Sequence, residues 1–124
     1  MAKVIVAEAS GKILDWLVGL CAGYELRLYG VTPSILAMVP GQGVIAPWRP
    51  TYYWNQGGPI IDREKIEMIP PADKDDREWM AVWYKCDDAE AGIQVGPTPL
   101  IAAMRCYVAS KLGDEVDIPE ELLP

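Results

Sequence analysis

Residues 62–65 place two carboxylates beside two cations, a group that could do acid–base chemistry. Asp62 or Glu64 could act as a catalytic base, and Arg105, in a later segment, could hold an anionic substrate. The chain has no histidine, which excludes the usual general base at neutral pH and every histidine-containing triad. A solvated, charge-balanced short helix is the simpler interpretation of residues 62–65, and Arg105 is expected to pair structurally with Asp62 or Glu64.

Two glycine-containing segments look superficially like anion cradles. They are Gly57-Gly58-Pro59 and Gly96-Pro97-Thr98-Pro99. Proline has no backbone N–H, so both segments lose donors that a phosphate site requires. We therefore predict a tight turn at Gly57 and Gly58, with Pro59 opening a helix of one or two turns. At the second segment we predict a stiff turn and a helix N-cap.

The three cysteines, Cys21, Cys86 and Cys106, include no C-x-x-C pair and no spacing typical of a metal knuckle. Cys21 and Cys106 fall in helical patterns, where a thiol usually acts as a small hydrophobe. Two aspartates follow Cys86 and disfavour a reactive thiolate there. We expect structural thiols in a reducing, cytosolic setting, and neither a metal nor a cofactor.

The most suggestive feature for binding is aromatic. Trp48, Tyr52, Tyr53 and Trp54 crowd into seven residues beside Arg49, in a segment rich in proline and glycine. These rings could fold back as a lid on the core. Alternatively they could form an exposed anchor for a protein partner, because Trp, Tyr and Arg dominate binding hot spots. Stacking of single-stranded nucleic acid is disfavoured by the net charge of −7.

Several elements must position these residues. The 124 residues suit one domain, 1–124, and no apolar stretch is long enough to cross a membrane. Apolar spacing predicts a helix over residues 10–22, with Lys12, Asp15 and Gly19 opposite its apolar stripe and Gly23 ending it. Alternation predicts a half-buried strand over residues 24–29. Residues 35–39 and 43–46 could be edge strands or an ordered loop.

The second half of the chain gives clearer signals. Residues 66–69 are predicted as a strand, and 79–85 as a central strand, apolar on both sides and therefore covered on both faces. Residues 87–96 are predicted as a polar loop. Thr98 as N-cap, Pro99 at the first position and Gly113 past the end define a helix over 99–112. Its small-residue side could pack on the sheet or on another subunit. Residues 114–124 are predicted as an acidic tail, which could include one helical turn after Pro119.

These elements predict an α+β domain. A small antiparallel sheet of about three to five strands would carry the N-terminal and C-terminal helices, in an arrangement resembling an α/β/α sandwich.

Two long segments, 54–64 and 96–116, together resemble the NinX-like family of temperate-phage proteins, and the start of the first helix is similar to that family's opening. The resemblance covers most of the chain, although residues 31–49 and 72–90 match nothing recognisable. It implies a phage or prophage origin and expression in the cytoplasm of a bacterial host. It implies no reaction and supplies no catalytic residues, because the family has no assigned biochemical activity.

The leading hypothesis is therefore a non-enzymatic phage accessory protein that binds a host or phage protein. The surface would comprise residues 48–54 with the segment 57–64, and a homo-oligomer is possible. One alternative is a small-ligand or nucleotide-processing enzyme that uses Asp62 or Glu64 with Arg105. Another is acidic mimicry of DNA, if the acids at 73–78, 87–90 and 114–121 share one face.

Overall fold

The computed structural model describes residues 1–73, 75, 77–84 and 91–123, which form three α-helices and eight strands in three small antiparallel sheets. The helices are α1 (Gly11–Cys21), α2 (Trp54–Glu64) and α3 (Pro99–Leu112). The sheets are β1 (Ala2–Ile5) with β8 (Glu115–Ile118); β2 (Glu25–Tyr29), β3 (Ser34–Val39) and β4 (Gly43–Ile45); and β5 (Glu67–Ile69), β6 (Trp79–Tyr84) and β7 (Ala91–Gly96). The predicted α+β class, with helices packed on sheet, is confirmed. The strands are divided among three sheets, however, where one sheet was expected.

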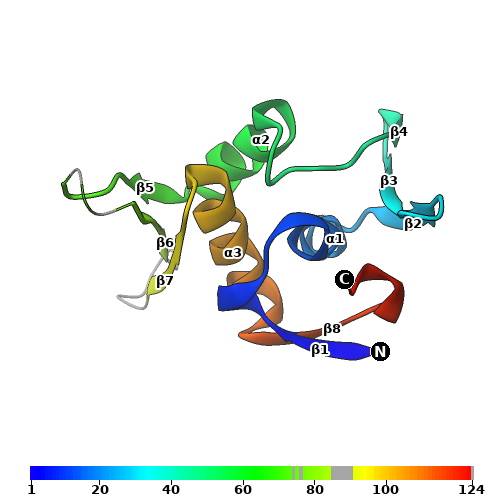
Figure 1. Cartoon of the computed structure of the whole chain (residues 1–124). Coiled ribbons are helices and arrows are strands. Elements are labelled where there is room, and N and C mark those ends of the chain that lie inside the picture. The colour runs from blue at the N-terminus through cyan, green and yellow to red at the C-terminus, as the bar shows by residue number, and fades with distance from the viewer. Residues whose placement is uncertain (74, 76, 85–90, 124) are drawn as a thin grey trace.

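Helix α3 is the centre of the molecule and lies between the β5–β6–β7 sheet and α1 (Figure 1). Its predicted ends are confirmed. Thr98 Oγ1 accepts the backbone N–H of Ile101 at 3.1 Å, Pro99 is the first helical residue, and Gly113 ends the helix with φ of +88°. Seven of its residues are buried, because the helix is covered on more than one side.

The small-residue side of α3 packs on the protein's own sheet. A Cβ placed on Gly96 of β7 would lie 2.8 Å from the backbone nitrogen of Ala102. Cys106 Sγ lies 3.6 Å from the carbonyl oxygen of Gly92. Glycine and alanine let the helix and the strand approach closely, so this side of α3 is not available to another subunit.

Helix α1 follows its predicted range and ends at Cys21; Gly23, with φ of +78°, stops it as predicted, and the N–H of Tyr24 donates to the carbonyl of Gly19. Of the three residues expected opposite the apolar stripe of α1, Lys12 is exposed, but Asp15 and Gly19 are buried, so the expectation is wrong for these two. A Cβ on Gly19 would lie 2.6 Å from Leu26 Cδ2 and 3.1 Å from Trp48 Nε1. The second side of α1 is therefore covered by β2 and by the loop that precedes α2.

The tight turn predicted at Gly57 and Gly58 is wrong, because both glycines lie within helix α2. The helix begins at Trp54, runs through both glycines and Pro59, and ends at Lys65 in a left-handed conformation with φ of +57°. A Cβ on Gly57 would collide with the carbonyl oxygen of Pro50 and would lie 2.6 Å from Leu100 Cδ2. This glycine therefore permits close packing of α2 and does not make a turn.

The middle of the chain forms the β2–β3–β4 sheet, so both segments that could have been edge strands or loop are strands. Leu26 and Leu28 of β2 are half-buried while Glu25, Arg27 and Tyr29 are exposed, which confirms the alternation predicted for residues 24–29.

The β5–β6–β7 sheet confirms β6 as the middle strand, and α3 packs on it. The predicted cover over both faces is incomplete, because Tyr84 at the end of β6 is exposed by 53 %. The polar loop predicted over 87–96 is wrong for Ala91–Gly96, which is β7; residues 87–90 lie outside the described part. β7 pairs with β6 from Trp79↔Gly96 to Tyr84↔Ala91.

The segment predicted as an acidic tail contributes β8, which pairs with β1, and a single 3-10 turn at Glu120–Leu122. Ile118 and Leu122 are buried in the core. In the part of the chain that the structure describes, no helix has both the length and the apolar character needed to span a bilayer.

Candidate functional site

Trp48 belongs to the core. Only 3 % of its surface is exposed, its indole lies edge-on to Tyr24 with ring centroids 5.3 Å apart, and its Nε1 donates to the backbone carbonyl of Asp15 at 2.9 Å. The lid interpretation is therefore correct for Trp48, which cannot also anchor a partner at the surface.

The other aromatic residues of this segment face outward. Tyr52 and Trp54 are exposed by 63 % and 56 %, and Tyr53 is half-buried. The guanidinium of Arg49 lies 4.5 Å from the ring centroid of Tyr52 and 5.7 Å from that of Tyr53. We call Arg49, Tyr52, Tyr53 and Trp54 the aromatic surface. It combines large rings with a cation, the composition typical of binding hot spots.

Gln56 and Asp15 hold the loop that carries the aromatic surface. Gln56 Oε1 accepts the backbone N–H of Arg49 at 2.6 Å, and Gln56 Nε2 donates to the carbonyl of Pro47 at 3.0 Å. Asp15 Oδ1 accepts the backbone N–H of Thr51 at 2.9 Å. These hydrogen bonds fix the backbone of the loop that carries the exposed rings, so a partner would not have to order this loop on binding.

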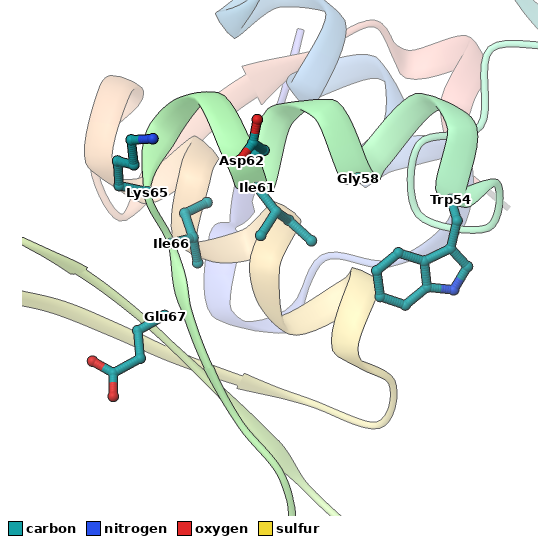
Figure 2. A pocket seen from close by; sticks show the side chains of 7 residues that line it. All are labelled: Trp54, Gly58, Ile61, Asp62, Lys65, Ile66 and Glu67. Atoms are coloured by element: carbon teal, nitrogen blue, oxygen red, sulfur yellow. The ribbon is translucent and has the colours of Figure 1, made fainter.

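A shallow groove of about 470 Å³ continues from the aromatic surface along α2. Trp54 lies at one end of the groove. The side chains of Ile61 and Ile66 lie on the same side of α2 as the indole of Trp54 (Figure 2). Asp62, Lys65 and Glu67 also line the groove. The predicted binding residues Gly57, Gly58 and Asp62 are thus separated: Gly57 is buried, whereas Gly58 and Asp62 line the groove.

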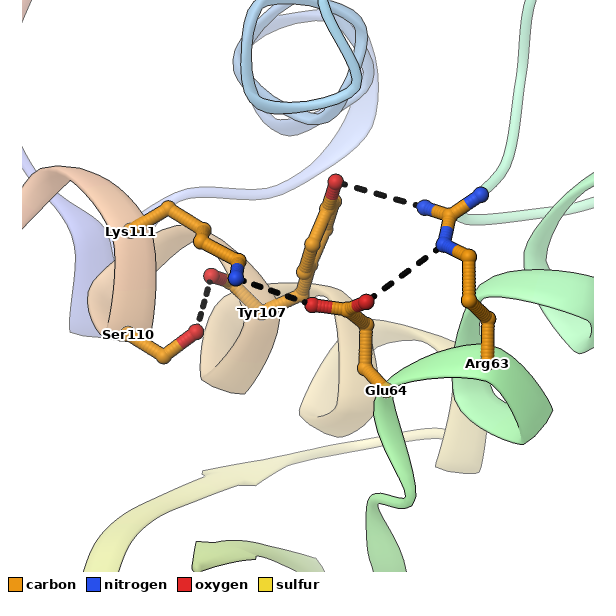
Figure 3. Close-up of polar contacts among 5 residues, drawn as sticks. All are labelled: Arg63, Glu64, Tyr107, Ser110 and Lys111. Carbon is orange, nitrogen blue, oxygen red and sulfur yellow. Dashed lines mark hydrogen bonds and ion pairs between the residues drawn. The ribbon is translucent and has the colours of Figure 1, made fainter. Parts of the chain in front are cut away.

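The residues considered for catalysis are not brought together. Glu64 pairs with Lys111 at 3.1 Å and with Arg63 at 3.4 Å, and Arg63 also reaches the hydroxyl of Tyr107 (Figure 3). This network joins α2 to α3. Asp62 lies on the groove and has no part in the network.

The expected ion pair of Arg105 with Asp62 or Glu64 is wrong. Arg105 Nε donates to the carbonyl of Ala9 at 2.7 Å, and its Nη1 donates to the carbonyl of Val95 at 2.8 Å. A guanidinium can satisfy its donors with backbone carbonyls as well as with carboxylates, and here it ties α3 to both the N-terminal segment and β7.

Asp15 is the functional candidate that sequence reasoning missed. Its side chain is almost fully buried, and burial raises its pKa to about 6, against the opposing effects of Thr51 and Arg49. Its local sequence gives no sign of this role, because its partners lie more than 30 residues away.

The described cysteines are unsuited to nucleophilic chemistry. Burial raises the pKa of the Cys21 thiol to about 12 and that of Cys106 to about 11, so both stay protonated at neutral pH. Cys86 lies outside the described residues. Among those the structure describes, no group of three or more His, Cys, Asp or Glu side chains could hold a metal ion. The acids at 87–90, needed for DNA mimicry, also fall outside the described part.

The fold and this surface define a small α+β protein that presents a pinned aromatic loop beside a shallow groove. A sequence model of the family described as "Bacteriophage P22, NinX" matches residues 5–111. The chain therefore belongs to the NinX family of bacteriophage proteins, as the resemblance of residues 54–64 and 96–116 implied. A comparison with curated proteins found no match.

Proposed function

We propose that this phage protein acts without catalysis, by binding a host or phage protein in the cytoplasm of the infected bacterium. The aromatic surface carries the proposal: Tyr52 and Trp54 are exposed on a loop whose backbone is held by Gln56 and Asp15. Exposing large rings on an ordered backbone is unfavourable for a monomer, and it is typical of an anchor for another molecule.

The chemistry of this surface specifies what the partner must offer. The groove beside Trp54 suits an apolar side chain, because Ile61 and Ile66 line it. The Arg49 guanidinium lies over two tyrosine rings and makes no ion pair with a described carboxylate within 4.0 Å. A partner with an acidic residue next to an apolar one would satisfy both features.

Site-specific photo-crosslinking in infected cells tests this proposal. A benzophenone amino acid would replace Tyr52 in one variant and Val31, a fully exposed residue of the β2–β3 turn, in the matched control. We expect one protein to be captured from position 52 and not from position 31. Trp54→Ala should then weaken binding of that purified protein by at least about tenfold.

Two outcomes would contradict the proposal. One is equal capture of the same proteins from both positions. The other is an unchanged affinity of the captured protein for the Trp54→Ala variant.

A further inference from the structure

Gly58, in the middle of α2, is needed neither for the conformation of this helix nor for its packing. Glycine is a weaker helix former than every other residue except proline. The φ angle of Gly58 is not positive, so the backbone does not require glycine there. Among the described atoms, a Cβ added to Gly58 would meet only Trp54 Cε3 within 4 Å, at 3.8 Å, which is an ordinary contact. The neighbouring Gly57, by contrast, faces Pro50 and Leu100 and is needed for packing.

Gly58 leaves a notch in the groove beside α2. Along the helix it lies between Trp54 and Ile61, whose side chains are on the groove side (Figure 2). Residues 54, 58, 61, 62 and 65 all line the groove, and at about 100° per residue they fall within an arc of about 100°. The groove is therefore an exposed side of a helix, with a gap where a central side chain would stand.

The two ends of the groove differ in charge. At one end is the aromatic surface, where the exposed Arg49 makes no ion pair within 4.0 Å with a described carboxylate. At the other end Asp62 and Lys65, three residues apart on the same side of α2, carry opposite charges that largely compensate one another. The Arg49 end therefore selects an acidic residue of a partner, and the Lys65 end selects neither sign of charge.

We propose that an amphipathic helix of the partner protein lies along α2 in this groove and inserts an apolar side chain over Gly58, between Trp54 and Ile61. An acidic residue near one end of the partner helix meets Arg49. This inference rests on the proposed function, because it concerns the same surface, and it adds the kind of element that binds there and the residue that admits it.

The side of a helix fits a second helix better than it fits an extended segment. Helices pack by setting the side chains of one between those of the other, and small residues at the contact bring the two axes closer. An extended peptide gains much of its affinity from main-chain hydrogen bonds to the edge of a sheet. The side of α2 offers few such groups, because N–H and C=O groups inside a helix bond to one another. A helix brings its own main-chain bonds and needs only the apolar notch.

Selection from an mRNA-displayed library of random peptides, each of about 16 residues or roughly four helical turns, tests the inference on the immobilised full chain. We expect the enriched peptides to carry apolar residues at i, i+3 or i+4, and i+7, with Asp or Glu near one end. Binding should increase the helical circular dichroism signal of the best peptide. Gly58→Leu fills the notch, so it should weaken binding of this peptide by at least about tenfold.

Gly92→Leu is the matched control. Gly92 lies on β7, outside the groove, and a Cβ added there would meet no described atom within 4 Å, so the same exchange should leave peptide binding unchanged. Thermal unfolding would establish that both variants fold. Should Gly58→Leu not fold, Gly58→Ala provides the test, because it should stabilise the helix and still weaken the peptide. A purely structural role of Gly58 would not give these opposite changes.

Three outcomes overturn the inference. The first is that no peptide is enriched. The second is that the enriched peptides alternate apolar and polar residues and gain no helical signal on binding. The third is that the best peptide binds Gly58→Leu as tightly as the wild type. The proposed function fails separately, by equal capture from positions 52 and 31. A protein captured from position 52 that binds Gly58→Leu as tightly as the wild type contradicts this inference alone.

Discussion

The carboxylate of Asp15, on α1, accepts the backbone N–H of Thr51, at a distance of 2.9 Å. Through this bond a buried charge in the first helix holds the loop that presents the aromatic surface. The main-chain carbonyl of the same residue accepts Trp48 Nε1, so one residue of α1 binds the loop at two points.

Asp15→Asn should remove a pH dependence of stability. The folded pKa of about 6 lies above the ordinary value of 3.8, so this group contributes stability that is fully present below pH 3.8 and is lost as the pH rises through 6. The free energy of unfolding of the wild type should fall by roughly 1.4 kcal/mol between pH 5 and 7.5 relative to Asp15→Asn. Urea unfolding of both proteins at these two pH values measures this change in the free energy of unfolding. No histidine titrates in this window.

Asp117→Asn is the control, because Asp117 is exposed on β8. This variant should keep the slope of the wild type. Identical slopes for wild type and Asp15→Asn would show that the Asp15 carboxyl titrates as it does in the unfolded chain.

Gly57→Ala and Gly58→Ala should change stability in opposite directions. At Gly57 the new methyl group would meet the backbone of Pro50, which cannot move as a flexible side chain can, so we expect a loss of about 2 kcal/mol or more. At Gly58 the nearest atom is Trp54 Cε3 at 3.8 Å, an ordinary contact, and alanine should stabilise α2 by about 0.5–1 kcal/mol. Thermal unfolding of both variants checks the signs; stabilisation by Gly57→Ala would contradict the packing described for α2.

Trp48 and Trp54 should respond differently to truncation. Trp48→Ala removes a buried ring and leaves the carbonyl of Asp15 without its indole donor, so it should destabilise the fold by about 3–5 kcal/mol. Trp54→Ala removes an exposed ring and should change the free energy of unfolding by less than about 1 kcal/mol. Chemical denaturation of the two variants provides the comparison. Similar losses in both would mean that Trp54 is part of the core.

Arg105→Met should cost about 1–3 kcal/mol, because the carbonyls of Ala9 and Val95 lose a charged donor. Most of the cost should remain when the salt concentration is raised from about 0.05 to about 0.5 M, because the hydrogen bonds to the two carbonyls persist while salt screens the attraction between Arg105 and Glu78. Denaturation at both salt concentrations distinguishes this bonding from a surface salt bridge, for which the cost would shrink strongly in high salt.

Helix α3 was predictable because its signals are local. Thr98, Pro99 and Gly113 lie at the ends that they specify, and each acts on backbone within a few residues. Alternation likewise placed β2, and a continuous apolar run placed β6. The division into three sheets was not predictable, because strand pairing depends on which segments meet in space and on no single segment's pattern.

The errors share one cause, namely partners distant in the sequence. The local sequence around Gly57 is typical of a turn. Gly57 is instead a packing residue, because Pro50 and Leu100 approach it closely. Asp15 was expected to lie opposite the apolar stripe of its helix, but the loop at residues 48–51 covers it. For the candidate site, the sequence grouped Tyr52 and Trp54, which are exposed, with Trp48, which is buried, and it could not separate them.

The pairing of β1 with β8 sets an order of events for a newly made chain (Figure 1). The strand that leaves the ribosome early has its partner more than 100 positions later, at Glu115–Ile118. At a synthesis rate of about 5–20 residues per second, β1 is made on the order of ten seconds before β8, the strand to which it is hydrogen-bonded. The last step of folding therefore follows synthesis of β8, and until then the nascent chain carries an unpaired strand that host chaperones can recognise.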